Sequence, residues 1–273
     1  FVGILLLLTA ANIAFHLARL GAPLGAPNQY VKLALYLVVF IVAIMAGRVT
    51  PSFTKNAIPQ ARIRMRPWLD RLALVLLALT FAVYASGAAP QLAGVLAACA
   101  ALAHLARVAG WDPLCTRNQP ILWILHLSYA WIPVGLVLLA CAAFGVVPEV
   151  LALHAFGAGA VGGMVIGMIT RTARGHSGLP LQVGGAEVFA YVLVHLAALL
   201  RVLPALIALL FFVAVALHGY LPGSDHPNPA KPASSAAGIQ SKKLIGAMQP
   251  TMKRTPTASH PANLAVAVLR LFC

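Results

Sequence analysis

The sequence contains very few acidic residues. Five of its 273 residues are Asp or Glu, against 19 Lys and Arg, and charged residues of both signs make up 9% of the chain. A soluble domain covers much of its surface with charged side chains, whereas 61% of this sequence is hydrophobic and its mean hydropathy is +0.91. The composition therefore excludes a soluble globular protein.

Cysteine is also scarce. The four cysteines form no Cys-x-x-Cys motif, so the sequence signals neither a zinc knuckle nor covalent attachment of c-type haem. The chain has no initiator Met, and it starts inside an apolar run without a basic segment before it. We therefore do not interpret residues 1–20 as a signal peptide, and we expect the chain to be an N-terminally truncated fragment of a longer protein.

Long apolar runs are what the sequence does contain. Runs of about 18 or more apolar residues can cross a bilayer of ~30 Å as a helix. Gly and Pro residues separate most of the runs, and this pattern predicts an all-α, polytopic transmembrane bundle. The predicted spans are residues 1–20, 30–47, 70–86, 91–108, 120–144, 148–170, 185–201 and 204–220.

Lys and Arg gather in alternate connections between these spans. Because cytoplasmic loops are enriched in Lys and Arg, the alternation predicts a multi-pass membrane protein with both chain ends in the cytoplasm. Cations in short loops do not form a nucleic-acid-binding face, so the expected partner is the lipid bilayer and not nucleic acid. The cationic connections are 47–71, 108–119 and 171–184, and those without cations are 21–29, 87–90 and 145–148.

The last part of the chain has a different composition. Residues 221–273 are rich in Pro, Ser, Thr and Lys and show no helical period. We predict a transmembrane domain over residues 1–220 and a disordered, basic cytoplasmic tail over residues 221–273.

Histidine is the principal candidate for chemistry in the spans. Each one could be a neutral imidazole that forms a hydrogen bond to another helix. Ionisable groups within a membrane are costly, however, and five together favour ligation of a metal or haem, for which imidazole is suited. The five are His16, His104, His126, His154 and His195.

The positions of these histidines along the spans suggest two cofactor sites. His104 and His126 each lie about one turn from the predicted cytoplasmic face, on neighbouring antiparallel helices. His16 and His154 lie about one turn from the other face, and His195 is nearer the middle. Two pairs at two depths could therefore hold two cofactors.

The segment PILWILHLSYAWIP at 120–133 adds aromatic side chains to this picture. Trp123, His126 and Tyr129 follow each other at intervals of three, close enough in angle to share a helix face. Pro133 is expected to kink the helix. A kinked aromatic face of this kind predicts a lined cavity, although Trp123 could also belong to an interfacial aromatic belt.

The segment 154–178, HAFGAGAVGGMVIGMITRTARGHSG, combines two further signals. Gly159, Gly163 and Gly167 recur every four residues, which predicts close packing against another helix. The segment then ends in Arg and His residues, and GRVTPSFTKN at 47–56 is a similar polar helix end on the same predicted face. Arg side chains suit carboxylates and lipid headgroups, so the two ends predict an anion site formed by Arg48, Arg171, Arg174 and His176.

Three segments resemble the signature segments of the NnrS family: GRVTPSFTKNA at 47–57, PILWILHLSYAWIPVGL at 120–136 and HAFGAGAVGGMVIGMITRTARGHSGLPL at 154–181. The resemblance extends over about residues 1–205. It implies a bacterial inner-membrane protein that contains haem and copper and is associated with denitrification and nitric oxide resistance. Arg48, His126, His154, Arg171 and His176 lie in the matching segments, but the resemblance assigns no ligand to any of them.

These observations favour a membrane protein that carries haem b, with copper as a second candidate cofactor and nitric oxide as a candidate ligand. His126 and His154 are then the first-choice axial ligands, with His104 and His16 as their partners. Two other interpretations stay open: a cofactor-free transporter in which the histidines relay protons, and a structural subunit of a respiratory complex. The sequence identifies no catalytic residue and does not decide whether the protein is an enzyme.

Overall fold

A computed structural model describes residues 2–220, and all regular structure in that range is helical. The helices α2, α3, α4 and α5 each begin with a proline, which has no N–H to leave unpaired at a helix start. The elements are α1 (Val2–Arg19), α2 (Pro27–Ala57), α3 (Pro67–Ser86), α4 (Pro90–Ala109), the short 3₁₀-helix η1 (Pro113–Thr116), α5 (Pro120–Ala143), α6 (Glu149–His154), the π-helix η2 (Ala155–Gly162), α7 (Gly163–His176) and α8 (Gly185–Tyr220).

Within the described residues, seven helical segments are long and apolar enough to span a bilayer. One of them is the continuous segment Glu149–His176, which comprises α6, η2 and α7. The prediction of an all-α, polytopic membrane protein is therefore confirmed.

The predicted division of residues 185–220 into two spans is wrong, because α8 runs without interruption through Pro204. Proline is tolerated inside transmembrane helices, since neighbouring groups can satisfy the backbone carbonyl that it leaves free. The prediction that both chain ends face the cytoplasm required a turn near Arg201, and α8 contains no such turn. The predicted disordered tail at 221–273 lies outside the described residues.

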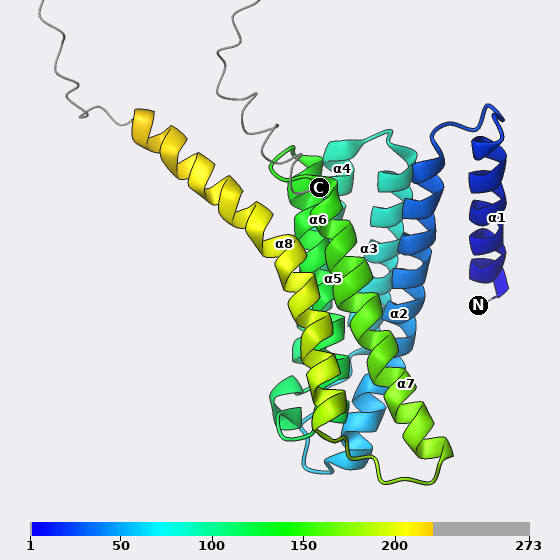
Figure 1. The fold of residues 1–273 in the computed structure, drawn as a ribbon, viewed down its shortest axis with the longest axis vertical. Helices are drawn as coiled ribbons and strands as arrows, with labels where there is room; N and C mark the ends of the chain where they lie inside the picture. Colours follow the sequence, from blue (N-terminus) through cyan, green and yellow to red (C-terminus); the bar gives the residue numbers. More distant parts are fainter. Residues whose placement is uncertain (1, 221–273) are drawn as a thin grey trace, which may run out of the picture. The chain divides into compact units, whose positions relative to one another are not determined.

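The chain divides into two units after Ile207, inside α8, and the packing below is that of the first unit. Helix α5 is its centre, with 72% of its apolar stretch buried, compared with 6% for α1. It packs against α4, α2 and the segment from α6 to α7, while α3 lies against α4, and α1 packs against α2 (Figure 1).

The glycine stripe packs against α5, as predicted. A Cβ atom at Gly159 would overlap the Trp131 ring, and one at Gly163 would overlap Ser128. At Gly167 a Cβ would lie only 3.0 Å from Ile124 and from Leu125. The π-helix η2 directly precedes Gly163 and widens the helix by about one residue per turn where it passes α5.

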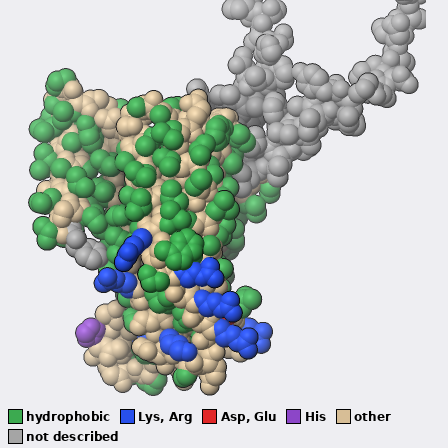
Figure 2. Space-filling view, turned by 180° about the vertical axis from the view of Figure 1, so that it is seen from behind, with side chains coloured by type: hydrophobic (Ala, Val, Ile, Leu, Met, Phe, Trp, Pro, Cys, Tyr) green, Lys and Arg blue, Asp and Glu red, His purple; other side chains and the backbone are tan. Residues whose placement is uncertain are grey.

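The three cationic connections lie at one end of the bundle, which we call the cationic end (lower end in Figure 1). On the face in Figure 2, Lys and Arg gather in the half of the molecule towards this end, and hydrophobic side chains are spread over the other half. Two of the connections are tied together, since the Arg64 N–H donates to Gly110 O at 2.7 Å and the Arg62 N–H donates to Asp112 Oδ2 at 2.9 Å. The distribution agrees with the positive-inside pattern, while the sidedness itself stays a prediction.

Candidate functional site

The interior near the cationic end contains a buried polar cluster around Arg107 of α4. Its Nε donates to Asp70 Oδ1 of α3 at 2.6 Å, and its Nη1 donates to Ala43 O of α2 at 3.0 Å and to the Tyr129 hydroxyl of α5 at 2.8 Å. Arg107 is only 4% exposed. One guanidinium thus joins four helices, and its charge is compensated by a carboxylate.

Gly47 of α2 makes this arrangement possible, because a Cβ atom there would overlap the Arg107 guanidinium. The guanidinium also lies over the rings of Trp111, at 5.4 Å, and Tyr129, at 5.7 Å, which are cation–π distances. In the sequence, Arg107 flanks the cationic connection 108–119, and its pairing with Asp70 was not predicted. The sequence does contain a sign of this pair. Asp70 lies in the first turn of α3 and Arg107 in the last turn of α4, so the two residues lie at the same end of neighbouring antiparallel helices.

His126 of α5 lies beside this cluster and is 3% exposed. Its Nε2 is 2.9 Å from the Thr54 hydroxyl of α2, which donates its own hydrogen to Thr50 O at 2.9 Å. The hydroxyl has one hydrogen, so it must accept from Nε2–H, and we assign the tautomer on this basis. The Nδ1 atom therefore carries a lone pair, and it has no hydrogen-bond partner.

His195 of α8 has the opposite arrangement. The Trp131 indole N–H donates to its Nδ1 at 3.0 Å, so a neutral His195 carries its hydrogen on Nε2. That Nε2 is buried without a hydrogen-bond partner and faces the backbone of Gly163. Metal-bound imidazoles usually donate from the second nitrogen, whereas this one accepts there. The geometry thus does not favour ligation by His195.

His104 of α4 is also committed to a protein partner. Its Nδ1 is 2.6 Å from the Tyr129 hydroxyl, which accepts from Arg107 and can donate to His104. The hydrogen of His104 is then on Nε2, which lies beside the backbone of Ala73 without the geometry of a hydrogen bond. Of the three fully buried histidines in the described residues, His126 alone presents an unused lone pair.

The two predicted histidine pairs are placed differently in the structure, and their role as ligand pairs stays a prediction. His104 and His126 belong to the same cluster, since Tyr129 contacts His104 and the Trp111 ring packs against both Tyr129 and His126. His16 and His154, in contrast, share no hydrogen bond or ring contact within the described residues.

These two histidines occupy different surroundings. His16 of α1 is exposed and lines a cleft of about 410 Å³ together with Phe15 and Tyr30. His154 ends α6 and is half-buried. In residues 2–220 no three His, Cys, Asp or Glu side chains converge in a way that could hold a metal ion.

The predicted aromatic face of α5 does not line a single cavity. Trp123 packs against Tyr191 of α8 at 5.9 Å, whereas Tyr129 faces α4 and is fully buried in the Arg107 cluster. Three residues along an α-helix correspond to a rotation of about 300°, so Trp123 and Tyr129 each point about 60° away from His126, on opposite sides of it. This difference directs the two rings to different neighbouring helices.

The two predicted Arg-containing helix ends are in contact. The Arg171 guanidinium of α7 lies 3.8 Å from the ring centroid of Phe53, which belongs to the 47–56 segment of α2. Both line a cleft of about 310 Å³ with His176. Arg174 is bound elsewhere, to Glu187 Oε1 at 3.1 Å and Pro180 O at 3.0 Å, and Arg48 lines a separate cleft. The four predicted residues therefore do not form a single anion site. Arg171 and His176 line one cleft, Arg48 lines another, and Arg174 belongs to an ion pair.

These features define a polytopic α-helical membrane protein with a hydrogen-bonded polar cluster around Arg107 and a buried histidine, His126, whose Nδ1 lone pair is unused. The family described as NnrS protein matches residues 1–221 of the chain, and the chain belongs to the NnrS family. At family level, this membership makes it a nitric oxide-related membrane protein. Comparisons with curated proteins and with solved structures found no match.

Proposed function

We propose that the chain is a metal-cofactor protein of the bacterial inner membrane that acts in the response to nitric oxide. Family membership supports the connection with nitric oxide. The single observation that supports a cofactor is the Nδ1 atom of His126, a buried imidazole nitrogen whose lone pair has no hydrogen-bond partner. Its ring is oriented by Thr54, in the way that ligating histidines are commonly oriented by a hydrogen bond from their other nitrogen.

Copper fits this nitrogen better than haem does. A haem macrocycle needs a slot beside its ligand, but His126 is only 3% exposed. A metal ion needs no slot, and imidazole is a suitable ligand for copper. His126 supplies one bond of such a site, and the described residues place no second His, Cys or carboxylate with it as a ligand set.

Haem b is proposed for the clefts that contain a histidine. The cleft at His16 and the cleft at His176 have volumes of about 410 and 310 Å³, within the usual range for ligand sites. The second cleft also contains Arg171, whose guanidinium suits a propionate carboxylate. A bound haem or copper would supply a metal to which nitric oxide can bind, and nitric oxide, small and uncharged, reaches such a site through the bilayer.

The test is a metal analysis and a reduced-minus-oxidised optical spectrum of the full-length protein, recorded with and without nitric oxide. We expect His126→Ala to lose copper while His154→Ala retains it. We also expect one of the two variants His16→Ala and His176→Ala to lose the b-type haem spectrum, which identifies the cleft that holds the haem. A wild-type protein with no bound metal and no haem spectrum would reject the proposal and favour a cofactor-free transporter.

A further inference from the structure

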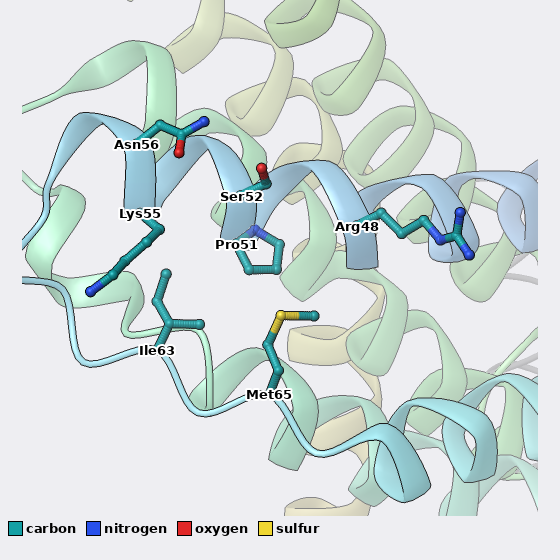
Figure 3. Close-up of a pocket in the computed structure, with 7 residues that line it drawn as sticks. All are labelled: Arg48, Pro51, Ser52, Lys55, Asn56, Ile63 and Met65. Atoms are coloured by element: carbon teal, nitrogen blue, oxygen red, sulfur yellow. The ribbon is translucent and has the colours of Figure 1, made fainter.

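A second cationic cleft lies at the cationic end, between α2 and the segment that follows it. Figure 3 shows Arg48 at one end of this cleft and Lys55 at the other, with Pro51, Ile63 and Met65 between them. We call this space of about 370 Å³ the Arg48 cleft. Its apolar floor is thus flanked by two positive charges.

The acidic side chains of the described residues are all engaged elsewhere. Glu149 binds Lys32, Asp70 binds Arg107 and Glu187 binds Arg174, while Asp112 accepts from the Arg62 backbone. Arg48 forms no hydrogen bond or ion pair in residues 2–220 and is exposed. No acidic side chain in residues 2–220 therefore compensates the charge of the Arg48 cleft.

The neighbouring cation is only partly engaged. The Lys55 ammonium donates to two backbone carbonyls, Pro59 O at 2.8 Å and Ala61 O at 3.3 Å. These contacts anchor the side chain, but carbonyls leave its positive charge in place. With three donors, an ammonium can also bind an anion.

The depth of the cleft matches the phosphate level of a bilayer. The apolar run 30–47 of α2 is about 27 Å long at ~1.5 Å per residue, close to the ~30 Å hydrocarbon core. Arg48 follows this run directly, and Lys55 lies about 10 Å further along the helix. The two cations therefore lie where phospholipid phosphates are found, while Pro51, Ile63 and Met65 offer an apolar surface.

We infer that the Arg48 cleft binds one anionic phospholipid. Its phosphate pairs with Arg48 at one end of the cleft, and the positive charge of Lys55 at the other end adds to the attraction. The headgroup lies over Pro51, Ile63 and Met65, and the acyl chains extend past Arg48 along the apolar run of α2. A guanidinium and an ammonium at the membrane surface each contribute to anionic lipid binding, and an enclosing floor selects one lipid from the surrounding bilayer.

The test measures phosphatidylglycerol retained by the full-length protein in native mass spectrometry, after exchange from vesicles of phosphatidylglycerol and phosphatidylcholine. We expect the double variant Arg48→Gln/Lys55→Gln to retain at most about one tenth of the phosphatidylglycerol that the wild-type protein retains. Arg71→Gln/Arg117→Gln is the matched control, because it removes two exposed cations of the same end that do not line the cleft. Equal losses in both double variants would overturn the inference, since they indicate general attraction only.

A third variant distinguishes the contribution of the cleft's shape from the contribution of its two cations. Met65→Trp fills the floor and keeps both cations, and it is expected to lose the bound lipid to a similar extent. Wild-type retention by Met65→Trp would overturn the inference, and so would release of the lipid by excess inorganic phosphate, which indicates a site for free phosphate. These readouts do not depend on any cofactor, so the result stands apart from the test of the proposed function.

Discussion

The two ends of the bundle use similar polar side chains in different surroundings. Away from the cationic end, Lys32 of α2 pairs with Glu149 of α6, and the Tyr36 hydroxyl donates to the same carboxylate at 3.0 Å. The Lys32 and Glu149 side chains are 40% and 25% exposed. At the cationic end, the corresponding cation is Arg107, at 4% exposure, with a carboxylate, a tyrosine, a histidine and a backbone carbonyl around it.

This difference shows which pair the fold depends on. A partly exposed pair loses little when it is broken, because water solvates the separated charges. A buried pair cannot be broken at one side without leaving an uncompensated charge in a low-dielectric interior. We therefore expect the Arg107 cluster, and not the Lys32–Glu149 pair, to govern stability.

The largest effect is expected from Arg107→Met. It leaves the Asp70 carboxylate without its cation, and we expect unfolding to become easier by ~3–5 kcal/mol. Denaturant unfolding in detergent micelles measures this change. The double variant Arg107→Met/Asp70→Asn should recover part of the loss, and a single-variant loss below about 1 kcal/mol would contradict the role of the pair.

The orientation of His126 within the same end can be tested by two threonine variants. Thr54→Val removes the acceptor of the His126 Nε2–H, and we expect the copper affinity proposed for His126 to fall ~10–100-fold, as measured by competition with a chelator. Thr50→Val is the control, because the Thr50 hydroxyl is buried without a partner and its loss should be near neutral. Equal copper affinities of the two variants would contradict the hypothesis that Thr54 orients the His126 ring.

Gly47→Ala tests how tightly the Arg107 guanidinium is held. The new Cβ overlaps a group tied by three hydrogen bonds, and we expect a loss of ~1–3 kcal/mol in the same unfolding assay. Gly175→Ala is the control, since a Cβ at that helical position meets nothing within 4 Å. No difference between the two variants would show that Arg107 can move without cost.

The smallest effect is expected from Glu149→Gln. The Lys32 ammonium remains partly solvated, so the loss should be at most ~1 kcal/mol and should shrink with added salt. Unfolding measured at two salt concentrations checks both statements. A loss equal to that of Arg107→Met would erase the contrast between the two ends of the bundle.

Much of the fold can be predicted from the sequence. Apolar runs of bilayer length, prolines at helix starts and glycines every four residues act locally, so they predict helices and their closely packed stripe without knowledge of their neighbours. The alternation of Lys and Arg placed the cationic connections at one end in the same way. The break predicted between residues 201 and 204 failed because a proline inside an apolar helix need not end it.

The sequence by itself determined the class of protein, its helical segments and its cationic end, because these depend on composition and spacing along the chain. Only the tertiary structure decided that Arg107 turns inward to Asp70 and that Trp123 and Tyr129 face different helices. It also decided that His126 keeps an unused nitrogen lone pair, while the nitrogens left without a partner in His104 and His195 carry hydrogen. The physical reason is that these helices are apolar nearly all round, so their pattern does not specify their rotation. Rotation determines which polar atoms meet, and an Arg at a helix end could equally have extended into the membrane surface.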